Sequence, residues 1–158
     1  MAPPPAKPIS FPADIDWRRR NTSRLLHSAA WLFDRRILDI VNRNGFPEIR
    51  MAHLHLPRNL DLEGTRLTVL ASRAEMSKQA MSELVDDGER MQLVTRRPDP
   101  ADRRAKIVVF TARGRHLIEV VGRAVTRAES EMRRKLGAED VAQLVASLAR
   151  YCTGSNPG

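Results

Sequence analysis

The sequence predicts a mainly α-helical fold that carries one small β-hairpin. Two long stretches near the chain ends, at about 21–43 and 112–135, repeat apolar residues at the spacing of one helical face. Between them, two short helical segments precede two strand-like runs that are separated by a proline-rich turn. A single domain is expected, because 158 residues supply one hydrophobic core and are too few for two ordinary domains.

The first long helix is expected to end near Gly45 and Pro47, which interrupt its apolar pattern. A shorter helix follows over 48–56 and is expected to stop before Pro57, because the residue before a proline disfavours the α region. The two long helices together present more apolar surface than a small core needs. This surplus predicts association between subunits, although the first and last helices could instead pack on each other within one subunit.

The middle of the chain has the form of a helix-turn-helix. A short helix is expected over 65–74, and Ser77 is a good N-cap for the helix that begins SKQAMSELVDD, because its hydroxyl can accept a hydrogen bond from a backbone N–H of the first turn. Two short helices that are separated by about three residues are typical of this motif.

A β-hairpin is expected directly after the second of these helices. Residues 93–97 and 106–111 favour strands, and the turn between them contains Pro98 and Pro100, which cannot donate backbone hydrogen bonds. A helix-turn-helix followed by a hairpin is a winged helix. A long helix over 112–135 follows, Gly137 breaks it, and a last helix closes the domain.

The net charge, the apolar segments and the cysteine content limit the kinds of function the chain can have. The chain has 27 Lys and Arg against 19 Asp and Glu, a formal charge of +8, which attracts polyanions such as nucleic acid or an acidic membrane surface. No segment approaches the roughly 18 apolar residues that a membrane span needs, so a soluble, cytoplasmic protein without a membrane partner is expected. Cys152 is the only cysteine, so an intrachain disulfide is excluded. Cys152 is expected to be an ordinary thiol.

Residues 25–148, roughly, resemble the MarR family of bacterial transcription regulators. The segment LVTRRPDPADRRAKIVVFTARG is similar to that family's wing, with Asp102 and Arg104 as its Asp-x-Arg pair and Thr111 and Gly114 closing it. SKQAMSELVDD is similar to its recognition helix. The chain departs from the family at Gly88, where leucine is common, and at Gln92, where glycine is common. Gly88 costs about 1 kcal/mol in helix propensity relative to alanine.

The resemblance implies a domain organisation and a function. A flexible, Pro-rich leader is expected over 1–16 from its composition, and the resemblance implies one domain over 17–152 followed by a flexible tail over 153–158. Within the domain, a winged helix over 46–111 would lie between dimerisation helices over 17–44 and 112–151. It also implies a homodimer that binds a pseudo-palindromic operator of double-stranded DNA. A small-molecule effector, aromatic or phenolic and either free or linked to coenzyme A, would release this repressor.

The recognition helix should enter the major groove with its first turns only, because 75–92 carries five acids against two basic residues. Gln79 is assigned to a base edge, since its amide can bond bidentately to adenine. Arg104 at the wing tip suits the narrow minor groove, and Asp102 is expected to orient a neighbouring arginine. Arg96 is expected to face solvent. The remaining DNA contacts, to bases or phosphates, are expected from Thr65, Arg66, Ser77, Lys78, Ser82, Arg97, Arg103 and Lys106.

His27, Trp31 and Arg35 recur every four residues on the first long helix, so they share a face and could line an effector pocket, to which we add His53. The alternative is that Trp31 is interface core and Arg35 is solvated. No cofactor, no metal and no enzyme activity are expected, because the chain shows no metal motif, phosphate-binding loop or catalytic constellation. The alternatives to a ligand-responsive repressor are a constitutive DNA-binding protein and a metal- or redox-responsive regulator.

Overall fold

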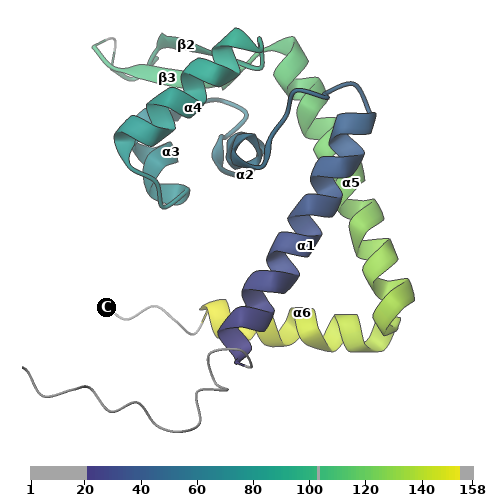
Figure 1. The fold of residues 1–158 in the computed structure, drawn as a ribbon. Coiled ribbons are helices and arrows are strands. Elements are labelled where there is room, and N and C mark those ends of the chain that lie inside the picture. The colour runs from purple at the N-terminus through teal and green to yellow at the C-terminus, as the bar shows by residue number, and fades with distance from the viewer. Residues whose placement is uncertain (1–20, 103, 154–158) are drawn as a thin grey trace, which may run out of the picture. The chain divides into compact units, whose positions relative to one another are not determined.

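A computed structural model describes residues 21–102 and 104–153. Contacts divide the chain into two units, Met1–Phe33 and Asp34–Gly158, and each is treated by itself below. The elements in chain order are α1 Thr22–Arg43, the short 3-10 helix η2 Met51–Leu54, α2 His55–Asn59, β1 Thr65–Arg66, α3 Leu67–Arg73, α4 Lys78–Arg90, β2 Val94–Pro98, β3 Lys106–Phe110, α5 Ala112–Leu136 and α6 Ala138–Thr153 (Figure 1). The expected mainly α fold with a small β wing is confirmed.

Side-chain caps mark the starts of α4 and α5, and a glycine marks the end of α5. Ser77 precedes α4, and its hydroxyl accepts a hydrogen bond from the Ala80 N–H at 3.1 Å. Thr111 does the same for α5, accepting from the Gly114 N–H at 3.1 Å. Gly137 ends α5 with a φ of 98°, a conformation that glycine adopts without steric cost. The N-cap prediction for Ser77 and the break at Gly137 are both confirmed.

The helix expected over 48–56 was wrong in its bounds. The backbone instead forms η2 over Met51–Leu54 and then α2 over His55–Asn59, so the helix continues past Pro57. Pro57 is the third residue of α2 and lies in its first turn, where backbone N–H groups have no intrahelical partner to lose. Proline therefore costs this helix no hydrogen bond.

The helix expected over 65–74 was also wrong at its start. Thr65 and Arg66 form β1, which pairs antiparallel with β3 through Thr65 opposite Val108 and Arg66 opposite Ile107. The sheet therefore has three strands in the order β1-β3-β2, where a two-stranded hairpin was expected. The Thr65 hydroxyl donates to the Asp61 carboxylate at 3.0 Å, which ties the start of β1 to the preceding turn. The helix proper, α3, begins only at Leu67.

Gly88 and Gln92, the two departures from the family pattern, have structural consequences. A Cβ built on Gly88 would lie 2.8 Å from Val94 Cγ2 and 3.0 Å from Leu56 Cδ1, so the absence of a side chain lets β2 and α2 approach α4 closely. Gln92 has a φ of 58°, in the left-handed region. The turn between α4 and β2 therefore needs a conformation that glycine would adopt more easily.

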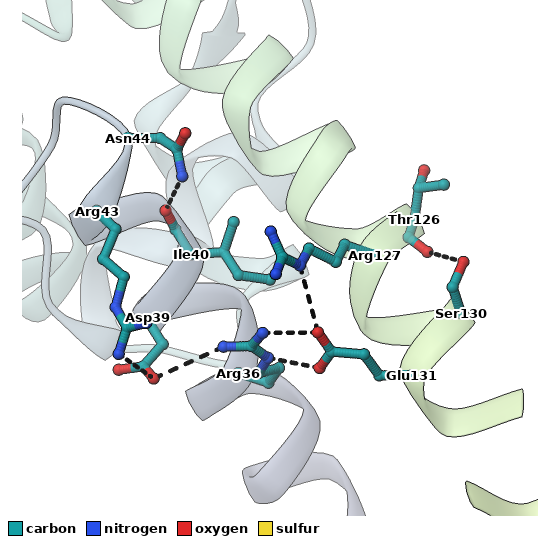
Figure 2. A network of polar contacts seen from close by, with 9 residues as sticks. All are labelled: Arg36, Asp39, Ile40, Arg43, Asn44, Thr126, Arg127, Ser130 and Glu131. Carbon is teal, nitrogen blue, oxygen red and sulfur yellow. Dashed lines mark hydrogen bonds and ion pairs between the residues drawn. The ribbon is translucent and has the colours of Figure 1, made fainter. Parts of the chain in front are cut away.

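The Asp34–Arg43 part of α1 is joined to α5 by a polar network, which Figure 2 shows from close by. Arg36 Nε and Nη2 each donate to the Glu131 carboxylate at 2.6 Å, and Arg127 Nε donates to the same carboxylate at 3.3 Å. These arginines, Arg36 first, lower the pKa of Glu131 to about 2. Ile37, Ile40 and Val41 of α1 are buried.

Candidate nucleic-acid interface

The first turn of α4 presents polar side chains to solvent. Ser77, Lys78 and Gln79 are exposed, whereas Met81, Leu84 and Val85 on the opposite face are buried in the core. The side-chain amide of Gln79 donates to Glu83 at 3.2 Å, one helical turn further on. The first turn of α4 therefore offers hydrogen-bond donors and one cation, and the buried opposite face holds the helix in place.

The wing consists of β2, β3 and the turn between them, with Arg97 opposite Ile107 and Pro98 opposite Lys106. Two carboxylates shape the described part of this turn. Asp99, which is buried, accepts a hydrogen bond from the Ala101 N–H at 2.8 Å, and Asp102 accepts one from the Arg104 N–H at 3.0 Å. The backbone N–H of Ala101, followed by the Arg66 side chain, lowers the pKa of Asp99. Both carboxylates thus close the turn locally, as aspartate side chains often do.

Arg66 on β1 braces the wing from the third strand. Its Nε donates to Asp99 Oδ2 at 2.6 Å, and its Nη2 lies 4.0 Å from Asp102 Oδ2. The hydrogen bond to Asp99 raises the pKa of Arg66. The sequence predicts phosphate contacts for Thr65 and Arg66 at the start of a helix. They lie instead on β1, where Thr65 is buried and its hydroxyl is bonded to Asp61.

Arg96 does not face solvent, so that expectation was wrong. Its guanidinium pairs with Asp86 at 2.7 Å and with Glu89, its backbone N–H donates to Glu89 Oε1 at 2.8 Å, and Ser82 accepts at 3.4 Å. Acids that would repel DNA from α4 are therefore neutralised by the wing. The sequence offered no signal for these pairs, because they join residues on two different elements.

Four basic side chains near α4 and the wing form no ion pair with a described residue. Within the described residues, Lys78, Arg97, Arg104 and Lys106 take part in no ion pair, whereas Arg66, Arg73 and Arg96 each pair with an acid. A groove of about 440 Å³ lies between α4 and the sheet. Its lining comprises Arg66, Leu67, Thr68, Lys78, Arg96, Ala105, Lys106 and Val108. Arg103, also assigned to DNA, lies outside the described residues.

The residues assigned to an effector pocket lie in both units. His27 and Trp31 line a shallow hollow on α1 with Ser28 and Leu32. Arg35 is exposed on the part of α1 that belongs to the second unit. His53 is buried in η2, where its Nδ1 accepts a hydrogen bond from the Arg50 N–H at 3.0 Å. Whether the four residues form one pocket stays a prediction.

Three further observations concern residues 21–102 and 104–153. None of the helices in these segments combines the length and the apolar character that crossing a membrane requires. No group of three or more His, Cys, Asp or Glu side chains in them could hold a metal ion. Cys152 is an exposed free thiol on α6.

Comparison with known proteins gives one family and a set of solved structures. Residues 58–105 match the model of the MarR family. No curated protein matches the chain. A cysteine mutant of MarR from E. coli, solved in complex with operator DNA, is 20% identical; the match covers 88% of this chain and 99% of that one with a TM-score of 0.71.

Two structures of MepR from S. aureus are also similar. A glycine-to-lysine mutant is 19% identical and matches 87% of this chain and 100% of its own with a TM-score of 0.65. MepR bound to ethidium bromide is 19% identical and matches 88% of this chain and 99% of its own with a TM-score of 0.55. The resemblance to the MarR family is therefore confirmed, by the family model over residues 58–105 and by the shared winged-helix fold.

Proposed function

We propose that this protein is a sequence-specific DNA-binding regulator of transcription, a homodimeric repressor that a small-molecule effector releases from a pseudo-palindromic operator. One observation carries the proposal: among the described residues near α4 and the wing, the basic side chains without an ion pair are Lys78, Arg97, Arg104 and Lys106. They are the cations that a winged helix would turn toward phosphates. The cations that brace the fold, Arg66 and Arg96, are separate from them.

In this proposal α4 and the wing contact different grooves of the DNA. The exposed first turn of α4 enters the major groove, where Gln79 reads a base edge and Ser77, Lys78 and Ser82 contact bases or phosphates. Gln79 must first leave Glu83, which costs little because both side chains are exposed. Arg104 reaches the minor groove from the wing tip, and Arg97 and Lys106 follow the backbone. Arg103 joins them, and Asp102 keeps the wing turn in shape.

Dimerisation is supported by apolar side chains that each unit leaves exposed. On α6 these are Leu144, Val145 and Tyr151, with Leu136 at the end of α5. On the first unit they are Leu25, Leu26, Trp31 and Leu32. Exposed patches of this kind mark association surfaces, and a two-fold dimer would present two wings to a two-fold symmetric operator.

An effector is supported by the fold that the chain shares with MepR, which binds ethidium bromide in one solved structure. His27, Trp31, Arg35 and His53 stay the effector residues that the sequence proposes. A constitutive DNA-binding protein is the second candidate function. A redox-responsive regulator would act through Cys152, which is exposed.

The proposal is tested by selecting DNA from a random pool with the purified protein. A selected consensus with two-fold symmetry, bound by a dimer in sedimentation experiments, is the expected result. If each protomer of a dimer neutralises four phosphates, the plot of log affinity against log salt should have a slope of about −7. Selection of no sequence above the random pool, together with a slope near zero, would contradict the proposal.

A further inference from the structure

One acid on the outward face of α4 has no basic partner. The other acids of this helix pair with arginines, through the side chains of Asp86, Asp87 and Glu89. Glu83 is exposed and forms no ion pair with any residue that the structure describes. A carboxylate in water needs no partner, so this arrangement becomes costly only where water is removed from Glu83.

Glu83 lies on the face of α4 that Gln79 occupies. The Gln79 amide Nε2 donates to Glu83 Oε1 at 3.2 Å, and both side chains are exposed. Residues four positions apart on a helix are neighbours on its surface, about 6 Å apart along its axis. Met81, Leu84 and Val85 are buried, so the core fixes the rotation of α4 about its axis. A groove of the DNA that receives Gln79 therefore also receives Glu83.

In that groove Glu83 needs a new hydrogen-bond donor. Within the described residues its carboxylate accepts a side-chain hydrogen bond from Gln79 alone, and on the proposed docking Gln79 turns away to a base. An ionised carboxylate can only accept hydrogen bonds, and burying it without a donor is costly. Phosphate oxygens are themselves negatively charged acceptors, so they repel it. The edge of a base is the source of donors that the DNA offers.

Cytosine is the base whose major-groove edge fits this carboxylate. It presents its N4 amino group as a donor, whereas adenine places its N6 amino group beside the acceptor N7, which repels a carboxylate. We propose that Glu83 is a specificity-determining residue that accepts a hydrogen bond from cytosine N4 in each operator half-site. This inference rests on the proposed DNA-binding function and names one base pair of the operator. Because base pairs are about 3.4 Å apart, this C·G pair lies within about two pairs of the one that Gln79 reads.

The carboxylate of Glu83 then acts on affinity and on specificity in opposite directions. Phosphates repel its charge, so it weakens binding to every DNA sequence. The hydrogen bond to cytosine offsets this repulsion only at a correct half-site. Removing the carboxylate should therefore strengthen non-specific binding and reduce discrimination between sequences. A residue that only stabilised α4 would weaken both kinds of binding when it is removed.

The first experiment selects DNA from a random pool with the full natural chain and, in parallel, with Glu83→Ala. We expect the natural chain to select one C·G pair in each half-site whose replacement weakens binding about tenfold. Glu83→Ala should lose that preference, keep the others and bind random DNA about twofold more tightly. A consensus that Glu83→Ala leaves unchanged would overturn the role of Glu83 alone. Selection of no sequence by the natural chain would overturn the DNA-binding function as well.

Two further variants make the assignment specific. Glu83→Gln should move the preference at this position from cytosine to adenine, because an amide can bond bidentately to adenine. Glu75→Gln is the charge-matched control, since Glu75 is exposed in the turn before α4 and forms no ion pair with a described residue. The control should leave every base preference unchanged. If Glu75→Gln also removes the cytosine preference, net charge sets that preference and the contact from Glu83 is wrong.

Discussion

Arg96 on β2 and Glu89 on α4 join the wing to the recognition helix through both backbone and side chain. The Arg96 N–H donates to Glu89 Oε1 at 2.8 Å, and the Arg96 guanidinium donates to Oε2 of the same carboxylate. The two side chains are 23% and 33% exposed, so water screens the pair only in part. These contacts therefore tie the wing to α4 through two different elements.

Replacing Arg96 with glutamine should reduce both stability and DNA affinity. We expect a loss of about 1–2 kcal/mol in the free energy of unfolding, because charge-assisted hydrogen bonds at a partly buried site are lost. DNA affinity should also fall, since the carboxylates of Asp86 and Glu89 on α4 would become uncompensated. Urea unfolding and DNA titration measure the two effects. Arg133→Gln, which breaks an exposed pair with Glu129, is the control and should cost less than about 0.5 kcal/mol.

Replacing Arg104 with alanine should weaken operator binding without affecting stability. Arg104 is exposed, and the hydrogen bond that shapes the turn comes from its backbone N–H, which alanine retains. The salt dependence should flatten by about one unit of slope per protomer, as expected when one phosphate or groove contact is lost. Arg134→Ala on α5 removes the same charge from another exposed position. An equal effect of both changes would indicate a loss of net charge and not of a wing contact.

The long elements were predictable because their cause is local. The period of apolar residues in α1, α5 and α6, the hydroxyl of Ser77 and the glycine at 137 each act within a few residues. β1 was missed for the opposite reason. It has two residues, and only the distant Val108 and Ile107 on β3 make it a strand.

The candidate site divides in the same way. The composition of the turn indicated a basic wing, but not which cations are available to a ligand. That distinction depends on Asp86, Glu89 and Asp99, which neutralise Arg96 and Arg66 across elements. The PDP turn contained a usable signal, since a buried aspartate beside prolines often bonds the backbone of its own turn. The hollow lined by Glu48, Arg50, His53, Asp87, Arg90 and Met91 had no such signal, because η2 and α4 meet only in the folded chain.

Replacing Gln92 with glycine should stabilise the fold. Gln92 has a φ of 58°, where a side chain costs about 1–2 kcal/mol. Glycine removes that cost but gains entropy in the unfolded chain, so the expected net gain is about 0.5–1 kcal/mol. The thermal midpoint should rise by a few degrees. Gln143→Gly, the same change within α6, should instead destabilise by about 1 kcal/mol. A Gln92→Gly protein that melts below the natural one would contradict the strain at this turn.

Replacing Gly88 with leucine, which is common at this position in the family, should destabilise this chain. A Cβ there would lie 2.8 Å from Val94 Cγ2 and 3.0 Å from Leu56 Cδ1, and both side chains are fully buried. We expect a cost of about 1–3 kcal/mol from overpacking, which exceeds the gain of about 1 kcal/mol in helix propensity. Adding Val94→Ala should recover part of the loss by making room. If Gly88→Leu alone raises the free energy of unfolding, the close approach of β2 and α2 to α4 is wrong.

The Arg36–Glu131 pair should make stability depend on pH in the acid range. The pKa of Glu131 is lowered from 4.5 to about 2, chiefly by the hydrogen bonds from Arg36. A carboxyl group with a depressed folded-state pKa stabilises the fold fully above its unfolded pKa, and this contribution is lost as pH falls through the folded value. The loss should therefore run from about pH 4.5 down to about pH 2.

Glu131→Gln should be less stable than the natural chain at neutral pH and should lose less stability across that window. Glu129→Gln, at an exposed pair with Arg133 on the same helix, is the control. Urea unfolding midpoints measured from pH 2 to pH 7 check the direction of this pH dependence. If the natural chain and the Glu131→Gln protein have parallel pH profiles, the pair contributes nothing to folding stability.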